Sequence, residues 1–377
     1  MAVTGRVILF GATGFTGRLT AEAMTRAGLA PVLAGRSADA LVAVTGDVAG
    51  LGPIDAPPTW RTADASDPAS VRALVSSPDD VLVSTVGPFT RLGRPAIEAA
   101  IEQGCSYLDS TGEPPFVRAV FEEYGPRAEQ TGARLLTAFG YDYVLGNLAA
   151  AHAIRDARSA GRVPVSVEIG YFVRGGLAIS SGTRASAAVM GSMRPFALRN
   201  GRIVDFAGRV TRFDVDGGQL DAMPVSGSEH FTLTRLDPGV RDVGVHLGWA
   251  GGWTRAAHAA GRLLSLGAGV PLLGSAVRAG VGKAVGGTTG EGPSAQKRAG
   301  TTSVAVARTL DGVGRQLSRA QVQGPSPYDL TADLLAWGAA MMLTGRATAP
   351  GALGPVDAFG FEALVSGCGD AGLRRVD

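Results

Sequence analysis

The stretch "GATGFTGRLT", Gly11–Thr20, decides the fold that we expect for this chain. It follows the strand-like run "RVILF" and leads into a segment whose apolar residues have helical spacing. Glycine at positions 11, 14 and 17 lets the backbone turn sharply and approach a phosphate with no Cβ atom in between. The helix that follows offers free N–H groups to an anion. The stretch is therefore a GxxGxxG variant of the dinucleotide-binding fingerprint, with an ordinary tight turn as the alternative.

Strand-like and helix-like segments alternate through the N-terminal part of the chain. The strand-like runs are "RVILF", "PVLAG", "TWRTAD", "VLVSTVG", "SYLD" and "ARLLTAF". Such alternation predicts βαβ units and a parallel, doubly wound sheet, which is a Rossmann domain. We also expect a helix to begin at Pro68 with Asp67 as its cap.

From Pro164 the pattern changes to strands without long helices between them. The runs "VSVEIGYFVRGG", "GRIVDFAG", "RVTRFDV", "HFTLTRL" and "TTSVAVARTL" predict an antiparallel sheet covered by helices. One helix is expected in "SSGTRASAAVMGSM", capped by Ser180 or Ser181, and another in "SPYDLTADLLAWGAAMMLTG". We therefore expect an α/β protein with an NADP-binding Rossmann domain in residues 1–145, an α+β substrate and dimerisation domain in 146–325, and a C-terminal helical segment in 326–377 that packs back on the Rossmann domain.

Composition narrows the class of protein. A chain of 377 residues exceeds what one compact core usually serves, and 45% hydrophobic with 18% charged residues describes a globular chain. The net charge of +2 is too small to indicate nucleic acid as a partner. Two cysteines and no leader-like segment favour a reducing cytoplasm. Four histidines without ligand-like spacing, and no CxxC pair, lead us to expect no metal.

The type of cofactor is decided at the end of the second strand, "LAGRS". Arg36, helped by Ser37, would pair with a ribose 2′-phosphate, which predicts NADP(H); a solvated surface arginine is the alternative. Asp64 borders the adenine or caps a turn. Small and rigid residues in "STVGPFTRLG" suit the ribose and nicotinamide, or form a structural turn. The expected cofactor-binding residues are Gly11, Thr13, Gly14, Phe15, Thr16, Gly17, Arg36, Ser37, Asp64, Thr85, Val86, Gly87, Pro88 and Phe89.

Hydride transfer also needs a proton donor where the product is protonated. Tyr141 is our first candidate and Asp142 our second, because they follow the sixth strand at the edge where ligands bind. Asp142 can serve only if burial raises its pKa; hinge residues between domains are the alternative. Tyr107, Asp109, Thr111 and Glu113 border the same edge from the fifth strand. The expected substrate contacts are Tyr143, Ser181 and Thr183.

Residues 243–290 contain no Asp or Glu but include Trp249, Trp253 and several basic residues. The longest uncharged run, Leu263–Val277, is shorter than the roughly 20 residues of a spanning helix. The segment therefore suits contact with an acyl chain or with the surface of a membrane. Helices packed internally, or at the interface of a homodimer, are the alternative.

Several stretches resemble one known family: "GATGFTGRL", "VGPFTRLGRPAIEAAIEQGCSYLDSTGE", "GYD", "SSGTRAS", "GEGPSAQKRAG" and "YDLTADLLAWGAAMML". They resemble the saccharopine dehydrogenase-like oxidoreductases, especially the branch with the bacterial trans-acting enoyl reductases. The resemblance implies a Rossmann domain, a second domain and NADP. After "GYD", however, Val144, Leu145 and Asn147 stand where the family commonly has small polar residues. Residues 1–150 also contain no lysine or histidine, so this part of the chain lacks the Lys/His pair with which the lysine-forming saccharopine dehydrogenases carry out acid–base catalysis.

Three functions follow as hypotheses. The first is NADPH-dependent reduction of an activated C=C bond in an enoyl thioester or a related lipid or polyketide intermediate, free or carrier-bound. The second is C=N reduction or amino-acid-type dehydrogenation, for which Arg174, Arg184 and Arg194 could bind a carboxylate. The third is a non-catalytic NADP-binding scaffold associated with a membrane.

Overall fold

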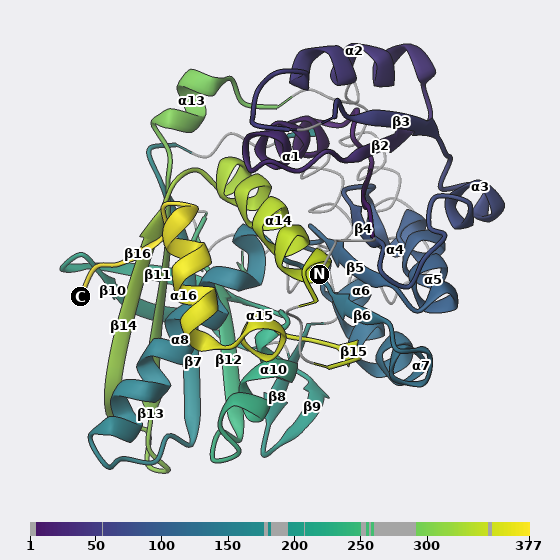
Figure 1. Ribbon diagram of the computed structural model, residues 1–377. Helices are drawn as coiled ribbons and strands as arrows, with labels where there is room; N and C mark the ends of the chain where they lie inside the picture. The colour runs from purple at the N-terminus through teal and green to yellow at the C-terminus, as the bar shows by residue number, and fades with distance from the viewer. Residues whose placement is uncertain are drawn as a thin grey trace, which may run out of the picture. The chain divides into compact units, whose positions relative to one another are not determined.

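The computed structural model describes residues 5–54, 56–176, 180–181, 195–206, 208–249, 254–255, 258–259, 292–345 and 349–377 (Figure 1). Its packing contacts divide the chain into two compact units. The first unit comprises Met1–Asp142, Thr289–Gly292 and Tyr328–Ala371, and the second comprises Tyr143–Thr288, Pro293–Pro327 and Gly372–Asp377. Each unit is built from segments that are distant in the sequence.

The first unit contains a seven-stranded sheet in the order β15-β6-β5-β4-β1-β2-β3. All of its strand pairs are parallel, which confirms the predicted Rossmann sheet. The order reverses between β1 and β4, and ligands bind at such a switch point. The strands are β1 (Val7–Phe10), β2 (Val32–Gly35), β3 (Thr59–Thr62), β4 (Val81–Ser84), β5 (Ser106–Asp109), β6 (Arg134–Leu136) and β15 (Gly351–Ala352).

The strands β1, β2, β4 and β5 are buried along their whole length, as expected for a sheet that helices cover on both faces. Asp67 caps α3 and Pro68 is its first residue, as the sequence predicts. Phe139, Trp337 and Phe359 pack ring against ring and fix two C-terminal helices to the end of β6. The helices are α1 (Phe15–Arg26), α2 (Ala38–Val48), α3 (Pro68–Arg72), α4 (Phe89–Leu92), α5 (Arg94–Gln103), α6 (Pro114–Ala119), a π-helical turn (Val120–Tyr124), α7 (Gly125–Thr131), α14 (Pro327–Leu343), α15 (Pro355–Phe359) and α16 (Phe361–Asp370).

The second unit is built on a mixed sheet. Its main path runs β10-β11-β12-β7-β13-β14-β16, and the hairpin of β8 and β9 pairs with β12. We predicted an antiparallel sheet, but β7 and β12 are parallel. Among the described residues, two hairpins and a helix lie between these strands in the sequence, which supplies the long crossover that a parallel pair needs. The strands are β7 (Ser166–Arg174), β8 (Phe196–Arg199), β9 (Arg202–Asp205), β10 (Thr211–Val215), β11 (Gly218–Val225), β12 (Asp242–Leu247), β13 (Thr302–Leu310), β14 (Gln316–Gly324) and β16 (Arg374–Arg375).

The described helices of this unit are α8 (Tyr141–Ser159), which begins in the first unit, α10 (Glu229–Leu236) and α13 (Ala295–Ala299). The run "HFTLTRL" was predicted as a strand, and this prediction is wrong because the run forms α10. Its aromatic and β-branched residues favour a strand locally, but His230 and Leu233, three positions apart, are buried on one side of a helix. Most of the helix expected in "SSGTRASAAVMGSM" lies outside the described residues.

Within the described residues, we find no helix that is long and apolar enough to cross a bilayer. The described part of the chain also contains no cluster of three or more His, Cys, Asp or Glu side chains that could bind a metal ion.

Candidate functional site

The loop after β1 has the geometry of a phosphate cradle. Gly11 has a φ of +93°, which suits glycine, and its carbonyl accepts a hydrogen bond of 3.0 Å from the N–H of Gly14. Helix α1 begins at Phe15, and no side chain caps its N-terminus. A Cβ atom on Gly17 would lie 2.1 Å from the Gly11 carbonyl oxygen, so only glycine fits there. The residues present therefore fit a bound pyrophosphate, whose charge the free N–H groups of α1 would face.

The other residues of this loop fasten it to its surroundings. Thr13 lies beside Gly35 at the end of β2, and its carbonyl accepts a hydrogen bond from Arg18. The ring of Phe15 meets Tyr328 edge to face at 5.1 Å. The carbonyl of Thr16 accepts the hydroxyl of Thr20 within α1.

We expect the second and third glycines to have separable roles. Gly17→Ala should lower the free energy of unfolding by about 2 kcal/mol, because its methyl group would overlap the Gly11 carbonyl. Gly14→Ala should leave stability near that of the wild type, because the new Cβ would lie 3.3 Å from the same oxygen, but it should weaken NADPH binding. Thermal unfolding without cofactor and NADPH titration measure the two effects. Equal melting temperatures for the two variants would contradict this assignment.

The residues expected at the adenosine end have different roles. Arg36 directly follows β2 and is exposed, and its guanidinium forms no ion pair within the described part of the chain. Ser37 caps α2, since its hydroxyl accepts a hydrogen bond from the Ala40 N–H. Asp64 accepts two hydrogen bonds of 2.8 Å from Ser66. These bonds, and the nearby charge of Arg36, hold the pKa of the Asp64 carboxyl below its usual range. Asp64 thus caps a turn, and Arg36 is the residue available to a 2′-phosphate.

The loop after β4 lies against the phosphate loop. The Thr85 hydroxyl is 3.3 Å from the Phe10 carbonyl and 3.2 Å from the Gly11 carbonyl, both of which can accept its proton. The Val86 side chain lies so near Gly11 that a Cβ there would come within 2.9 Å of it. Gly87 and Pro88 follow, joined by a cis peptide bond, and Phe89 is buried at the start of α4. The loop after β4 therefore packs directly against the phosphate loop through Thr85 and Val86.

The first turn of α8, which follows β6 after a short loop, carries the two expected proton donors. The side chain of Tyr141 is buried, with the residue only 2% exposed, and its backbone N–H donates to the Thr331 hydroxyl at 3.0 Å. Asp142 is half-buried, and a Cβ atom on Gly112 would lie 2.8 Å from its carboxyl Oδ2. Burial raises the pKa of the Asp142 carboxyl to about 7. Asp142 can therefore hold a proton near neutral pH and release it to a partner.

Comparison with known proteins agrees with this geometry. Residues 7–136 match the family model of the saccharopine dehydrogenase NADP binding domain. The N-terminal domain of this chain is therefore similar to that family. Its cofactor is NADP(H), and the predicted fold class and family resemblance are confirmed.

Curated relatives match part of the chain. A trans-acting enoyl reductase of Mycobacterium bovis is 40% identical over 144 residues, which are 38% of this chain and 34% of that protein. A trans-acting enoyl reductase of Mycobacterium ulcerans is 38% identical over 159 residues, 41% of this chain and 37% of that protein. The chain thus matches little more than a third of the length of these relatives.

Solved structures show that the fold as a whole is shared. The apo saccharopine dehydrogenase (L-Glu forming) of Saccharomyces cerevisiae aligns with a TM-score of 0.61 at 14% identity, covering 99% of this chain and all of that one. The homospermidine synthase of Legionella pneumophila aligns with a TM-score of 0.57 at 10% identity, covering 99% of this chain and 92% of that one. At these identities the likeness concerns the fold alone.

The remaining acidic residues at the edge of the NADP-binding domain support its loops. Asp109 is fully buried and accepts hydrogen bonds from the N–H groups of Thr111 and Ala138 and from the Thr137 hydroxyl. Its burial raises the pKa of this carboxyl to about 6. Glu113 is also fully buried and binds the first residues of α4. The sequence placed both residues at this edge but gave no sign that they bind backbone.

In the second unit, the expected substrate residue Tyr143 has a φ of +74° and donates its hydroxyl proton to the Ser226 carbonyl at 3.0 Å. Asn147 donates to the Tyr143 carbonyl at 2.7 Å and accepts from the Thr232 hydroxyl at 2.6 Å. These bonds tie α8 to the segment that begins α10. Ser181 is described and half-buried, whereas Thr183 and most of residues 243–290 lie outside the described residues.

Proposed function

We propose that this protein is an NADPH-dependent reductase that transfers hydride to the activated C=C bond of an enoyl thioester or a related lipid or polyketide intermediate. The Asp142 carboxyl carries this proposal, because burial raises its pKa to about 7 at the strand edge where the nicotinamide of a Rossmann domain lies. The enoyl reductase names of the curated relatives, which the chain matches over part of their length, add support.

Reduction of the C=C bond needs a hydride, a proton and a firmly bound cofactor. Bound NADPH supplies the hydride that forms the new C–H bond at the carbon β to the thioester carbonyl. The electron pair of the C=C bond then moves toward the carbonyl, and Asp142 donates a proton to the α carbon to complete the saturated product. Arg36 and the phosphate loop hold the other end of the cofactor. Solvent returns a proton to the Asp142 carboxylate before the next turnover.

We assign cofactor binding to the first unit and the acyl substrate to the second. Residues 243–290, which lack Asp and Glu, are our candidate for contact with the acyl chain or with a membrane surface. A homodimer through the second unit remains part of this proposal.

Reduction of a C=N bond has weaker support. Of the three arginines that could bind an amino-acid carboxylate, Arg174 pairs with Asp216, and Arg184 and Arg194 lie outside the described residues. Within the described part of the chain, no arginine of this set is therefore available.

Stereospecifically deuterated NADPH, incubated with a crotonyl thioester, a longer-chain enoyl thioester or a cyclic imine, tests the proposal. We expect NADPH oxidation with at least one enoyl thioester, and deuterium at the β carbon of the product. Turnover with the imine alone would replace the proposal by C=N reduction. Tight NADPH binding with turnover of none of the three would favour the scaffold.

A further inference from the structure

We propose that Glu113 is a positioning residue for the nicotinamide: its buried carboxylate fixes the loop after β4, and Asp109 holds the segment of Glu113 to the loop between β6 and α8, the helix that carries Asp142. This inference rests on the proposed function only for the role of Asp142. The NADP-binding domain itself needs no assumption about the substrate.

Glu113 binds the start of α4 through both carboxylate oxygens. Oε1 accepts the Phe89 N–H at 2.8 Å, and Oε2 accepts the Thr90 N–H at 2.9 Å and the Thr90 hydroxyl at 2.7 Å. Only an ionised Asp or Glu offers two acceptor oxygens and no donor, so this arrangement selects a carboxylate. Phe89 ends the segment Thr85–Phe89, where we expect the ribose and nicotinamide. Glu113 therefore sets where that segment lies.

The segment that carries Glu113 is itself fixed. The Thr111 N–H donates to Asp109 Oδ1 at 2.9 Å, and the Glu113 N–H donates to the Thr111 hydroxyl at 3.1 Å. Asp109, Thr111 and Glu113 all have 0% exposure. Burying two carboxyl groups in this way costs desolvation energy that an apolar segment would avoid. We infer that the arrangement is kept for geometry rather than for stability.

Asp109 extends this frame to the loop after β6. It accepts the Ala138 N–H at 2.8 Å and the Thr137 hydroxyl at 2.8 Å, and its carbonyl accepts the Phe139 N–H at 2.7 Å. Ala138 has a φ of +58°, a conformation that alanine adopts only when its surroundings hold it. Gly112 lies against the Asp142 carboxyl, and a Cβ atom there would come within 2.8 Å of it. One buried segment thus contacts both the nicotinamide loop and the proposed proton donor.

The Glu113→Gln variant tests this role by binding alone. In the wild type, donors of Phe89 and Thr90 face the two carboxylate oxygens of Glu113. Glutamine replaces one of these oxygens by an NH₂ group, which cannot accept their hydrogen bonds, so the loop should lose its position. We expect about tenfold weaker NADPH binding, which corresponds to the loss of roughly one hydrogen bond. The affinity for adenosine 2′,5′-bisphosphate should not change, because this ligand lacks the nicotinamide. Calorimetric titration of both ligands measures this split.

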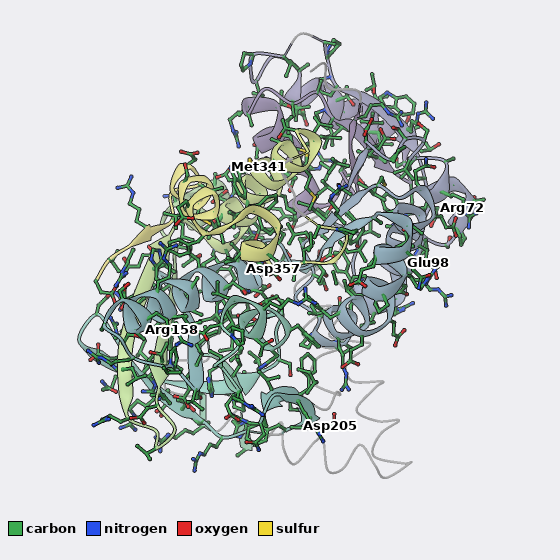
Figure 2. The ribbon with its side chains drawn as sticks, turned by 60° about the horizontal axis from the view of Figure 1, so that its bottom comes forward. Arg72, Glu98, Arg158, Asp205, Met341 and Asp357 are labelled. Atoms are coloured by element: carbon green, nitrogen blue, oxygen red, sulfur yellow. The ribbon has the colours of Figure 1, made fainter. Side chains whose placement is uncertain are left out.

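Glu102→Gln is the matched control, because Glu102 lies on α5 and pairs with Arg72, which projects from the surface of the first unit (Figure 2). Neither affinity should change in this control. Thr90→Val is a milder second variant, to be used if Glu113→Gln does not fold. It removes one of the three hydrogen bonds to Glu113, and we expect it to weaken NADPH binding about threefold.

Equal loss of both ligands, or no loss of either, would overturn the positioning role. A selective loss of NADPH affinity, in a protein that reduces no enoyl thioester, would support this inference while contradicting the proposed function.

Discussion

Replacing Asp142 by Asn will lower kcat for the enoyl thioester at least about 100-fold, since a positioned general acid contributes that much or more. The amide keeps the shape of the side chain but has no proton of suitable acidity to give. NADPH affinity should stay within about twofold, because the proposed loss falls on the protonation step. Steady-state kinetics with the enoyl thioester that the protein reduces, together with NADPH titration, measure both quantities.

The pH dependence follows from the same group. The pKa of Asp142 is raised from its ordinary value of 3.8 to about 7, so the carboxyl holds its proton below pH 7 and loses it above. The wild-type kcat should therefore fall tenfold per pH unit above about 7. The residual rate of the Asn variant should not show this step. A wild-type rate that stays level from pH 6 to pH 9 would show that Asp142 is not the acid.

Unfolding experiments separate this effect from damage to the fold. A carboxyl whose pKa is higher in the folded state than in the unfolded state destabilises the folded protein as pH rises through that interval. Asp142→Asn removes this penalty and should not lower the melting temperature at pH 8. Asp370→Asn, at the exposed end of α16, is the control for removal of one negative charge. Its kcat should equal that of the wild type.

Replacing Arg36 by Ala will weaken NADPH binding about 30-fold and NADH binding by no more than about twofold. The guanidinium is exposed at the end of β2, where a Rossmann fold places the adenosine ribose, and charge-assisted bonds to phosphate contribute about 2 kcal/mol. Titration of both dinucleotides at fixed ionic strength measures the difference. Arg26→Ala, in the last turn of α1, controls for the lost charge. Equal losses for NADPH and NADH would remove Arg36 from the 2′-phosphate site.

The local sequence predicted the first unit well because its signals are local. A glycine loop between a strand and a helix, and buried strands separated by helices, depend on the chemistry of neighbouring residues. The same logic placed the α3 start at Pro68. In the second unit, the strand predicted for "HFTLTRL" is wrong because these residues suit a strand or a helix, and only tertiary packing selects the helix.

At the candidate site, too, some features follow from the local sequence and others from the tertiary structure. The sequence by itself determined the glycine loop and the NADP(H) cofactor, because both follow from residue type and distance along the chain, and it predicts that Arg36 binds the 2′-phosphate. Only the tertiary structure decided the surroundings of each carboxyl. Burial raises the pKa of Asp142 to about 7 and that of Asp109 to about 6, and Glu113 accepts the N–H groups of Phe89 and Thr90. Burial and several hydrogen-bond partners come from distant segments, so these carboxyl groups acquire environments that residue type alone does not predict.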